Sequence, residues 1–326
     1  PTATAVLQKR CCKSRVGLLN SCLAEEVRMP AGISRDQAKQ WWLRCVSCSE
    51  ASATLINRDG GDEAPLIEQA SHLFSGGFMH QGHACGHLWG AALVAGNRAS
   101  RTVRGEHAKS AAALHAAIRL AEAFSEDGWS FTCRENTGVE LTSLAGRLRY
   151  LRSDKPRACG RKALAWTSQA SAAIDTALSE FDPDSVVKPC ANCAVECLRW
   201  VALPAGVQAD DRFVVAGLAG GLGLRGDVCA AISVGVFALS LQYYADRPGA
   251  RRDGMLRAAI QELNLIDYGL RRQPQQMLGD FAARFGSLRC EDITGRNFEN
   301  IDDHTLYVTG GGCRDVIEFT ADWLQA

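Results

Sequence analysis

Apolar residues recur along this chain at helical spacing, and strand-like alternation is scarce. In the first half, Ser34 can cap a helix that continues to Ile56, and apolar faces predict further helices over 66–74, 85–94 and 108–124. A similar series follows in the second half, over 190–201, 210–218, 228–244, 255–265, 274–285 and 314–324. We therefore expect an all-α protein.

The cysteines repeat in the same order in the two halves of the chain. Counted from the second cysteine of a leading pair, the intervals are 37, 48 and 26 residues in the first half and 36, 61 and 23 in the second. Three glycines before the central cysteine also recur, at a constant offset of 144 residues. The first set is Cys45, Cys48, Cys85, Cys133 and Cys159, and the second is Cys190, Cys193, Cys229, Cys290 and Cys313. This agreement predicts a tandem duplication.

Domain boundaries follow from this register. Proline and aspartate gather at 181–185, between the two cysteine sets. We expect an N-terminal appendage over 1–31, a first cysteine-framed helical repeat over 32–180 and a second over 186–326. Both repeats are expected to be helical bundles.

The cysteine and glycine blocks together resemble the C_GCAxxG_C_C family, which is named for this pattern, over about residues 45 to 326. The match is clearest in the second half, where a glycine-rich stretch over 220–226 precedes Cys229, and Cys290 and Cys313 follow in order. Gly86 follows the central cysteine in the first half, but Ala230 takes that place in the second. The resemblance implies a redox-active protein with a cysteine site in each repeat.

The spacing of the cysteines also suits metal binding. Residues three apart share a helix face, so Cys45 with Cys48, and Cys190 with Cys193, can point at one centre. Four converging thiolates suit an iron-sulfur cluster or a tetrahedral zinc ion. Because the resemblance implies redox chemistry, it favours iron-sulfur. The expected cofactor-binding cysteines are Cys48, Cys85, Cys133, Cys159, Cys193, Cys229, Cys290 and Cys313.

Histidines distinguish the two repeats. His83 and His87 flank Cys85, whereas Asp227 and Ala231 occupy the corresponding positions beside Cys229. Imidazole nitrogen is a common metal ligand, so a site that uses histidine can lie only in the first repeat. If one repeat alone binds a cofactor, we expect it to be the first. The expected metal ligands are Cys45, Cys48, Cys85, His83 and His87 there, and Cys190, Cys193 and Cys229 in the second repeat.

Two other interpretations remain open. A cysteine on an apolar helix face is often a small buried hydrophobe, and oxidised pairs can stabilise a fold without any redox role. The chain could then be a non-catalytic helical scaffold subunit of a large complex, with zinc or no cofactor. No acid-base pair or nucleophile motif in the sequence identifies an enzyme.

Charge and hydropathy indicate which classes of partner to expect. The chain has 36 basic and 36 acidic residues, and its short basic clusters lack interleaved aromatics, so nucleic acid is not expected. No run of eighteen apolar residues occurs, so we expect no membrane span. A soluble protein of the cytoplasm or an organellar matrix is favoured, with a redox partner protein or a larger complex as its partner.

Overall fold

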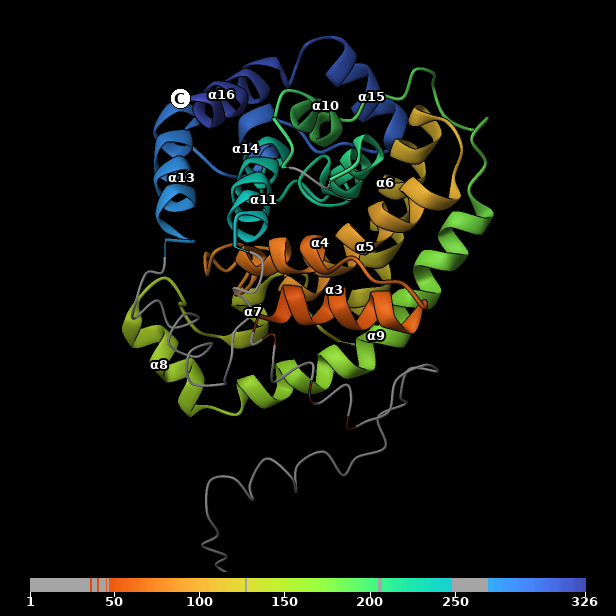
Figure 1. Cartoon of the computed structure of the whole chain (residues 1–326). Helices are drawn as coiled ribbons and strands as arrows, with labels where there is room; N and C mark the ends of the chain where they lie inside the picture. Colours follow the sequence, from red (N-terminus) through yellow and green to blue (C-terminus); the bar gives the residue numbers. More distant parts are fainter. Residues whose placement is uncertain are drawn as a thin grey trace, which may run out of the picture.

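The computed structural model describes residues 47–126, 128–204, 207–247 and 269–326, together with Asp36, Gln40 and Cys45 (Figure 1). The expected appendage over 1–31 and the expected helix over 255–265 lie outside the described residues. Within those ranges the fold is all-α, as predicted, and the only β-type pairings are two isolated bridges, Ala84 to Thr132 and Val228 to Arg289. No described helix is long and apolar enough to cross a membrane.

Most helices of the first repeat occupy the lower part of Figure 1, and most of the second repeat lies above them. The first repeat contains α3 (Cys48–Asp59), α4 (Pro65–Ala70), η1 (Ser71–Phe74), α5 (Gly86–Thr102), α6 (Glu106–Glu126), α7 (Cys133–Thr137), α8 (Leu144–Arg152) and α9 (Lys155–Glu180). The second contains α10 (Cys193–Arg199), η2 (Ala209–Leu218), α11 (Ala230–Ala245), α13 (Arg272–Phe285), α14 (Cys290–Thr294), α15 (Ile301–Thr309) and α16 (Arg314–Gln325). The segment expected as an α-helix over 210–218 is a 3-10 helix, η2.

Polar caps fix where the cysteine-bearing helices begin. The Ser47 hydroxyl accepts a hydrogen bond from the Glu50 amide at the start of α3, and the Asn192 side chain accepts from the Ala194 and Val195 amides at the start of α10. Cys48 and Cys193 are thereby the first residues of their helices. The central and closing cysteines Cys85, Cys229 and Cys313 are themselves N-cap residues, of α5, α11 and α16.

Hydrogen bonds of the glycine loops repeat with the offset seen in the sequence. Gly82 donates its amide to Gly76, as Gly226 does to Gly220. The central cysteines also have matching backbone hydrogen bonds. The Cys85 amide donates to the Phe131 carbonyl at 2.8 Å, and the Cys229 amide donates to the Leu288 carbonyl at 2.7 Å. The duplication is therefore present in the backbone as well as in the cysteine order.

Each glycine loop contains a left-handed helical turn. All five residues over 76–80 have φ between 52° and 71°, and all five over 220–224 have φ between 61° and 78°. Glycine tolerates this conformation, but Phe78, Met79 and Leu222 adopt it at a cost of about 1–2 kcal/mol each. The buried ring of Phe78 offsets part of that cost by packing 5.5 Å from Trp89.

The two repeats pack on each other reciprocally. In the first repeat α5 packs extensively against η2 of the second, and α11, the counterpart of α5, packs against α4 and η1 of the first. The approach is close, since a β-carbon on Gly96 of α5 would come 2.3 Å from the Val214 carbonyl oxygen. Rings also meet across the contact, with Phe74 stacked 6.4 Å from Phe237. One continuous apolar core therefore spans both repeats.

Candidate cysteine centres

Four cysteines of the first repeat converge on one buried place. The pKa of Cys85 is raised well above its usual value by burial and by the nearby thiols of Cys48 and Cys159. Tyr150 hydrogen-bonds to Cys159 and also interacts with Cys48 and Cys133. We call the set Cys48, Cys85, Cys133 and Cys159 the first centre.

Glycines bring these segments together. A β-carbon on Gly86 would come 2.3 Å from the Cys48 sulfur, and one on Gly77 would come 2.7 Å from the Cys133 β-carbon. No other residue fits at either position without displacing a cysteine. The glycines of the sequence pattern therefore have a steric role in gathering the thiols.

The second repeat gathers the corresponding set, Cys193, Cys229, Cys290 and Cys313, which we call the second centre. Burial and the neighbouring Cys193 raise the pKa of Cys229 to about 12. Cys290 has a raised pKa through burial and the proximity of Cys229 and Cys193. All four side chains are almost completely enclosed, with exposed fractions of 4 to 6%.

One thiol of the second centre differs from the rest. The Cys313 thiol hydrogen-bonds to Cys193, and this contact, followed by the proximity of His304, holds the Cys193 pKa well below its usual value. His304 Nε2 lies 3.3 Å from the Cys193 sulfur. The same hydrogen bond raises the pKa of Cys313. Cys193 is thus the cysteine most readily ionised in this centre.

A buried lysine lies beside the first centre. Lys162 is 4% exposed, and its Nζ lies 4.5 Å from the ring centroid of Phe124 and 5.2 Å from that of Trp166. Its positive charge favours the thiolate of Cys85 and so lowers the Cys85 pKa, in opposition to burial, which raises it. Counting from the closing cysteines, Val316 occupies the corresponding position in the second repeat. The two centres therefore differ in charge.

His87 also lies at the first centre. It is fully buried, and burial together with the Lys162 charge lowers its pKa to about 3, so its imidazole is neutral near pH 7. Ser52 Oγ lies 2.7 Å from His87 Nδ1.

His83 is oriented differently. Its Nδ1 lies 2.8 Å from Asp227 Oδ1 of the other repeat. Of the two histidines predicted as ligands, His87 is the one whose side chain lies against the backbone of Cys48 and Cys159.

The leading cysteine of each pair has polar neighbours outside its centre. Cys45 donates to Thr54 Oγ1 at 4.0 Å, and Cys190 accepts from Thr305 Oγ1 at 3.6 Å. The pKa of Cys190 is raised by burial and by Asp302, with no contribution from another cysteine. Because α3 and α10 begin at Cys48 and Cys193, the shared helix face expected for each pair does not form.

Four residues near the centres were not singled out from the sequence. Cys197 lies one helical turn after Cys193, and its pKa is raised by burial and by Cys229 and Cys193. Its spacing of four residues was the available signal. Lys162 lies three residues after Cys159 on α9, so its spacing was also a signal. Nothing in the local sequence marks Tyr150 and His304, because only the tertiary fold brings them to the cysteines.

The donor set can be compared with the needs of a metal. The described cysteines form no disulfides, and soft sulfur ligands suit iron-sulfur clusters and zinc. Among the described residues, no three cysteine, histidine or acidic side chains are placed to hold one metal ion. The residues therefore fit a sulfur-ligated centre by their chemistry, while their present spacing does not fit a single ion.

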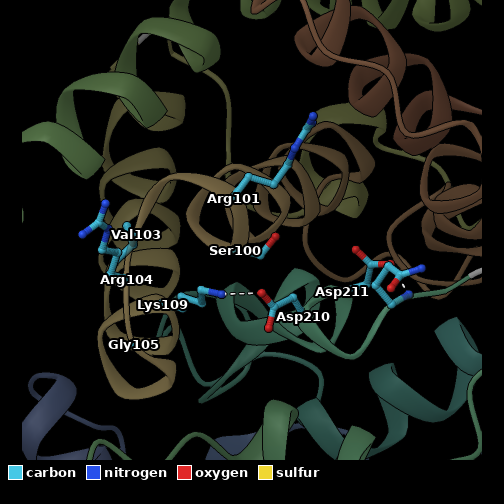
Figure 2. A pocket seen from close by; sticks show the side chains of 9 residues that line it. Ser100, Arg101, Val103, Arg104, Gly105, Lys109, Asp210 and Asp211 are labelled. Carbon is cyan, nitrogen blue, oxygen red and sulfur yellow. Dashed lines mark hydrogen bonds and ion pairs between the residues drawn. The ribbon is translucent and has the colours of Figure 1, made fainter.

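The cysteine centres are separate from an open cleft between the repeats (Figure 2). The cleft has a charged rim in which Lys109 Nζ lies 2.6 Å from Asp210 Oδ2. No cysteine lines it. It adjoins the C-terminal end of α5, roughly 20 Å along the helix from the N-terminal end at Gly86.

The comparison with protein families matches both repeats. The family model described as "Putative redox-active protein (C_GCAxxG_C_C)" covers residues 46–170 and again residues 190–326. This chain belongs to that family. The two tandem matches confirm the duplication and support a redox role for the cysteine centres. No curated protein and no solved structure matches the chain.

Proposed function

We propose that this C_GCAxxG_C_C protein carries electrons, and that its two centres are ligand sets for iron-sulfur clusters. The observation that carries the proposal is the convergence of four buried or half-buried cysteines in each repeat, from segments tens of residues apart. Apolar burial alone does not require cysteines to gather, and it does not require the same four positions in both repeats. A ligand shared by the four cysteines would require both.

Charge supports a cationic occupant. Burial and mutual repulsion raise the pKa values of Cys85, Cys229 and Cys290, so several adjacent thiolates are unfavourable without positive charge nearby. Iron ions would supply that charge. Backbone amides at the helix N-termini add partial positive charge, because most of the eight cysteines lie at the first residue or the N-cap of a helix.

Family membership favours a cluster over zinc. The matching family model is described as redox-active. A zinc ion has no redox chemistry of its own, whereas an iron-sulfur cluster does.

A bound cluster would supply one-electron redox chemistry, and the chain would hold and insulate it. Phe124, Trp129 and Trp166 surround Lys162 on one side of the first centre. Such a shell lets electrons pass to a redox partner protein while excluding solvent. Buried thiols are poorly placed to react directly with a large substrate.

The test is anaerobic purification of the full chain, followed by absorption spectroscopy and analysis of iron, zinc and acid-labile sulfide. We expect iron and sulfide in similar amounts, and a visible absorption that decreases on reduction. Zinc without colour would support a structural metal site instead. A colourless, metal-free protein would contradict the proposal, and if its thiols are also redox-inert it would support the scaffold interpretation.

A second candidate rests on the hydrogen bond between Cys313 and Cys193. The Cys193 thiolate can attack a small disulfide such as glutathione disulfide, releasing one thiolate that takes up a proton. The Cys313 thiol then loses its proton, attacks the Cys193 sulfur and releases the second small thiol, leaving a Cys193–Cys313 disulfide. Mass spectrometry of metal-free protein equilibrated in glutathione buffers tests this. A Cys193–Cys313 crosslink that disappears on reduction supports the dithiol function, and its absence at every potential contradicts it.

A further inference from the structure

The two repeats meet through a pair of residues at corresponding positions. His83 and Asp227 are 144 residues apart, the offset that relates the two glycine loops. His83 Nδ1 lies 2.8 Å from one Asp227 carboxylate oxygen, and the Ala84 amide donates to the other oxygen at 2.6 Å. Because a carboxylate can only accept, the His83 proton lies on Nδ1. The contact is largely enclosed, with side-chain exposures of 19% for His83 and 7% for Asp227.

The backbone of each member of the pair also accepts a hydrogen bond from a cysteine of its own centre. The Cys133 amide donates to the His83 carbonyl oxygen at 2.7 Å, and the Cys290 amide donates to the Asp227 carbonyl oxygen at 2.6 Å. In addition, Ala84 directly precedes Cys85. Three hydrogen bonds in series therefore connect Cys133 of the first centre to Cys290 of the second, through only two residues.

From this geometry we infer that His83 and Asp227 are positioning residues that couple the two cysteine centres. The inference rests on the proposed function, since it concerns how the two ligand sets influence each other. When the first glycine loop moves, the His83 carbonyl that accepts from Cys133 moves with it, and so does the His83 ring that contacts the second loop. Asp227 plays the same two parts in the second loop, toward Cys290 and the first loop. Opening or filling one centre therefore changes the stability of the other.

Local rigidity makes this transmission effective. Asp227 uses both carboxylate oxygens across the repeat boundary, which fixes its orientation as well as its distance. The left-handed turns on both sides have little freedom to absorb a shift, because a β-carbon on Gly77 would already meet the His83 carbonyl oxygen at 2.5 Å and one on Gly221 would meet the Asp227 amide nitrogen at 2.4 Å.

Another ion pair between the repeats provides a matched control. Lys109 and Asp210 also connect the two repeats, at 2.6 Å, but they lie at the charged cleft of Figure 2 rather than beside the cysteines. Lys109→Met removes an ion pair between the repeats without touching either glycine loop. His83→Phe removes the contact beside the centres while keeping a ring of similar shape.

The experiment measures coupling in the metal-free, reduced full chain. Cys85→Ser perturbs the first centre. Opening of the second centre is followed through the alkylation rates of Cys229 and Cys290, which are measured by mass spectrometry of the labelled peptides. In the otherwise unchanged chain we expect Cys85→Ser to change these rates by about 5-fold or more. In the His83→Phe background the change should fall below about 2-fold, whereas the Lys109→Met background should retain it.

Internal symmetry offers a rescue. Exchanging the pair, as His83→Asp with Asp227→His, places an imidazole and a carboxylate opposite each other again, so the coupling should return. The inference would be overturned if Cys85→Ser left the alkylation rates of the second centre unchanged in the otherwise unaltered chain. It would also be overturned if Cys85→Ser changed those rates equally in the His83→Phe background. Failure of rescue by the exchanged pair would also count against it. Iron binding without coupling contradicts only this inference, and coupling without iron contradicts only the proposed cofactor.

Discussion

Gly86 lies so close to Cys48 that a single methyl group at residue 86 would come 2.3 Å from the thiol sulfur. We predict that Gly86→Ala displaces Cys48 from the first centre and lowers stability by about 1–3 kcal/mol through overpacking. If both centres bind iron, the iron content per chain should fall by about half. Elemental analysis and urea unfolding of the purified variant measure the two effects.

The second repeat supplies the control, because Ala230 already occupies the corresponding position beside Cys229. Ala230→Gly should leave the iron content unchanged. Full iron retention in Gly86→Ala would show that the glycine has no part in assembling the centre.

The two centres should differ in how strongly they retain a cofactor. His87 and Lys162 lie at the first centre and have no counterparts at the second, where Ala231 and Val316 stand. If only one centre binds a cofactor, we predict that Cys85→Ser abolishes most cofactor retention and that Cys229→Ser leaves most of it, since a neutral hydroxyl is a poor ligand for a soft metal. The reverse order of metal content in the two purified variants would assign the cofactor to the second repeat.

Lys162 should stabilise the charge of a thiolate-ligated centre. Its ammonium group is enclosed by aromatic rings and favours ionised Cys85. Lys162→Met keeps most of the apolar stem and removes the charge. We predict faster loss of iron to a chelator from the variant, with the exposed Lys188→Met as the matched control. Equal release rates in both variants would argue against a role for the buried charge.

Residue His115 of α6 should contribute to the pH dependence of stability. Partial burial, assisted by Arg119, lowers its pKa, and the ring lies 5.8 Å from Phe181. The folded protein therefore holds this ring neutral. Stability from this residue is complete above the unfolded pKa of about 6.5 and decreases as the pH falls through it toward the lower folded value.

Urea unfolding of the wild-type chain and His115→Gln between pH 5 and 7.5 checks this prediction. The variant should lose less stability on acidification than the wild type. His87 titrates in both proteins, so the difference between them isolates His115. Parallel pH curves would contradict the assignment.

Position 223 tests the cost of the left-handed turn. Gly223 has φ of 61°, and a β-carbon there would lie 2.9 Å from the Ala117 carbonyl oxygen of the first repeat. Gly295 has a similar φ of 68° but nothing within 4 Å. Both alanine variants should lose about 1–2 kcal/mol through backbone strain, and Gly223→Ala should lose a further 1–3 kcal/mol, roughly, through overpacking. Equal losses in urea unfolding would rule out the steric part.

The cysteine register was predictable because it depends on order and spacing, which duplication preserves. The same holds for the all-α fold and for the glycine loops around Gly76 and Gly220. Helix starts were less predictable, because the caps Ser47 and Asn192 place Cys48 and Cys193 at the first helical residue and leave Cys45 and Cys190 before it.

Surroundings of the centres could not be read from the sequence. Tyr150 and His304 reach the cysteines only through the tertiary fold, and no local pattern distinguishes them from surface residues. The partner of His83 was likewise hidden, because a sequence shows that residues 83 and 227 correspond but not that they touch.

The contact between His83 and Asp227 bears on why the repeats share one chain. In an assembly of two identical subunits, a two-fold axis brings each residue on it against its own copy, which here would set imidazole against imidazole or carboxylate against carboxylate. A complementary acid-base pair on such an axis needs two different sequences held in fixed proportion. Gene fusion provides this, and it leaves each copy free to change its own chemistry while the partner remains permanently attached.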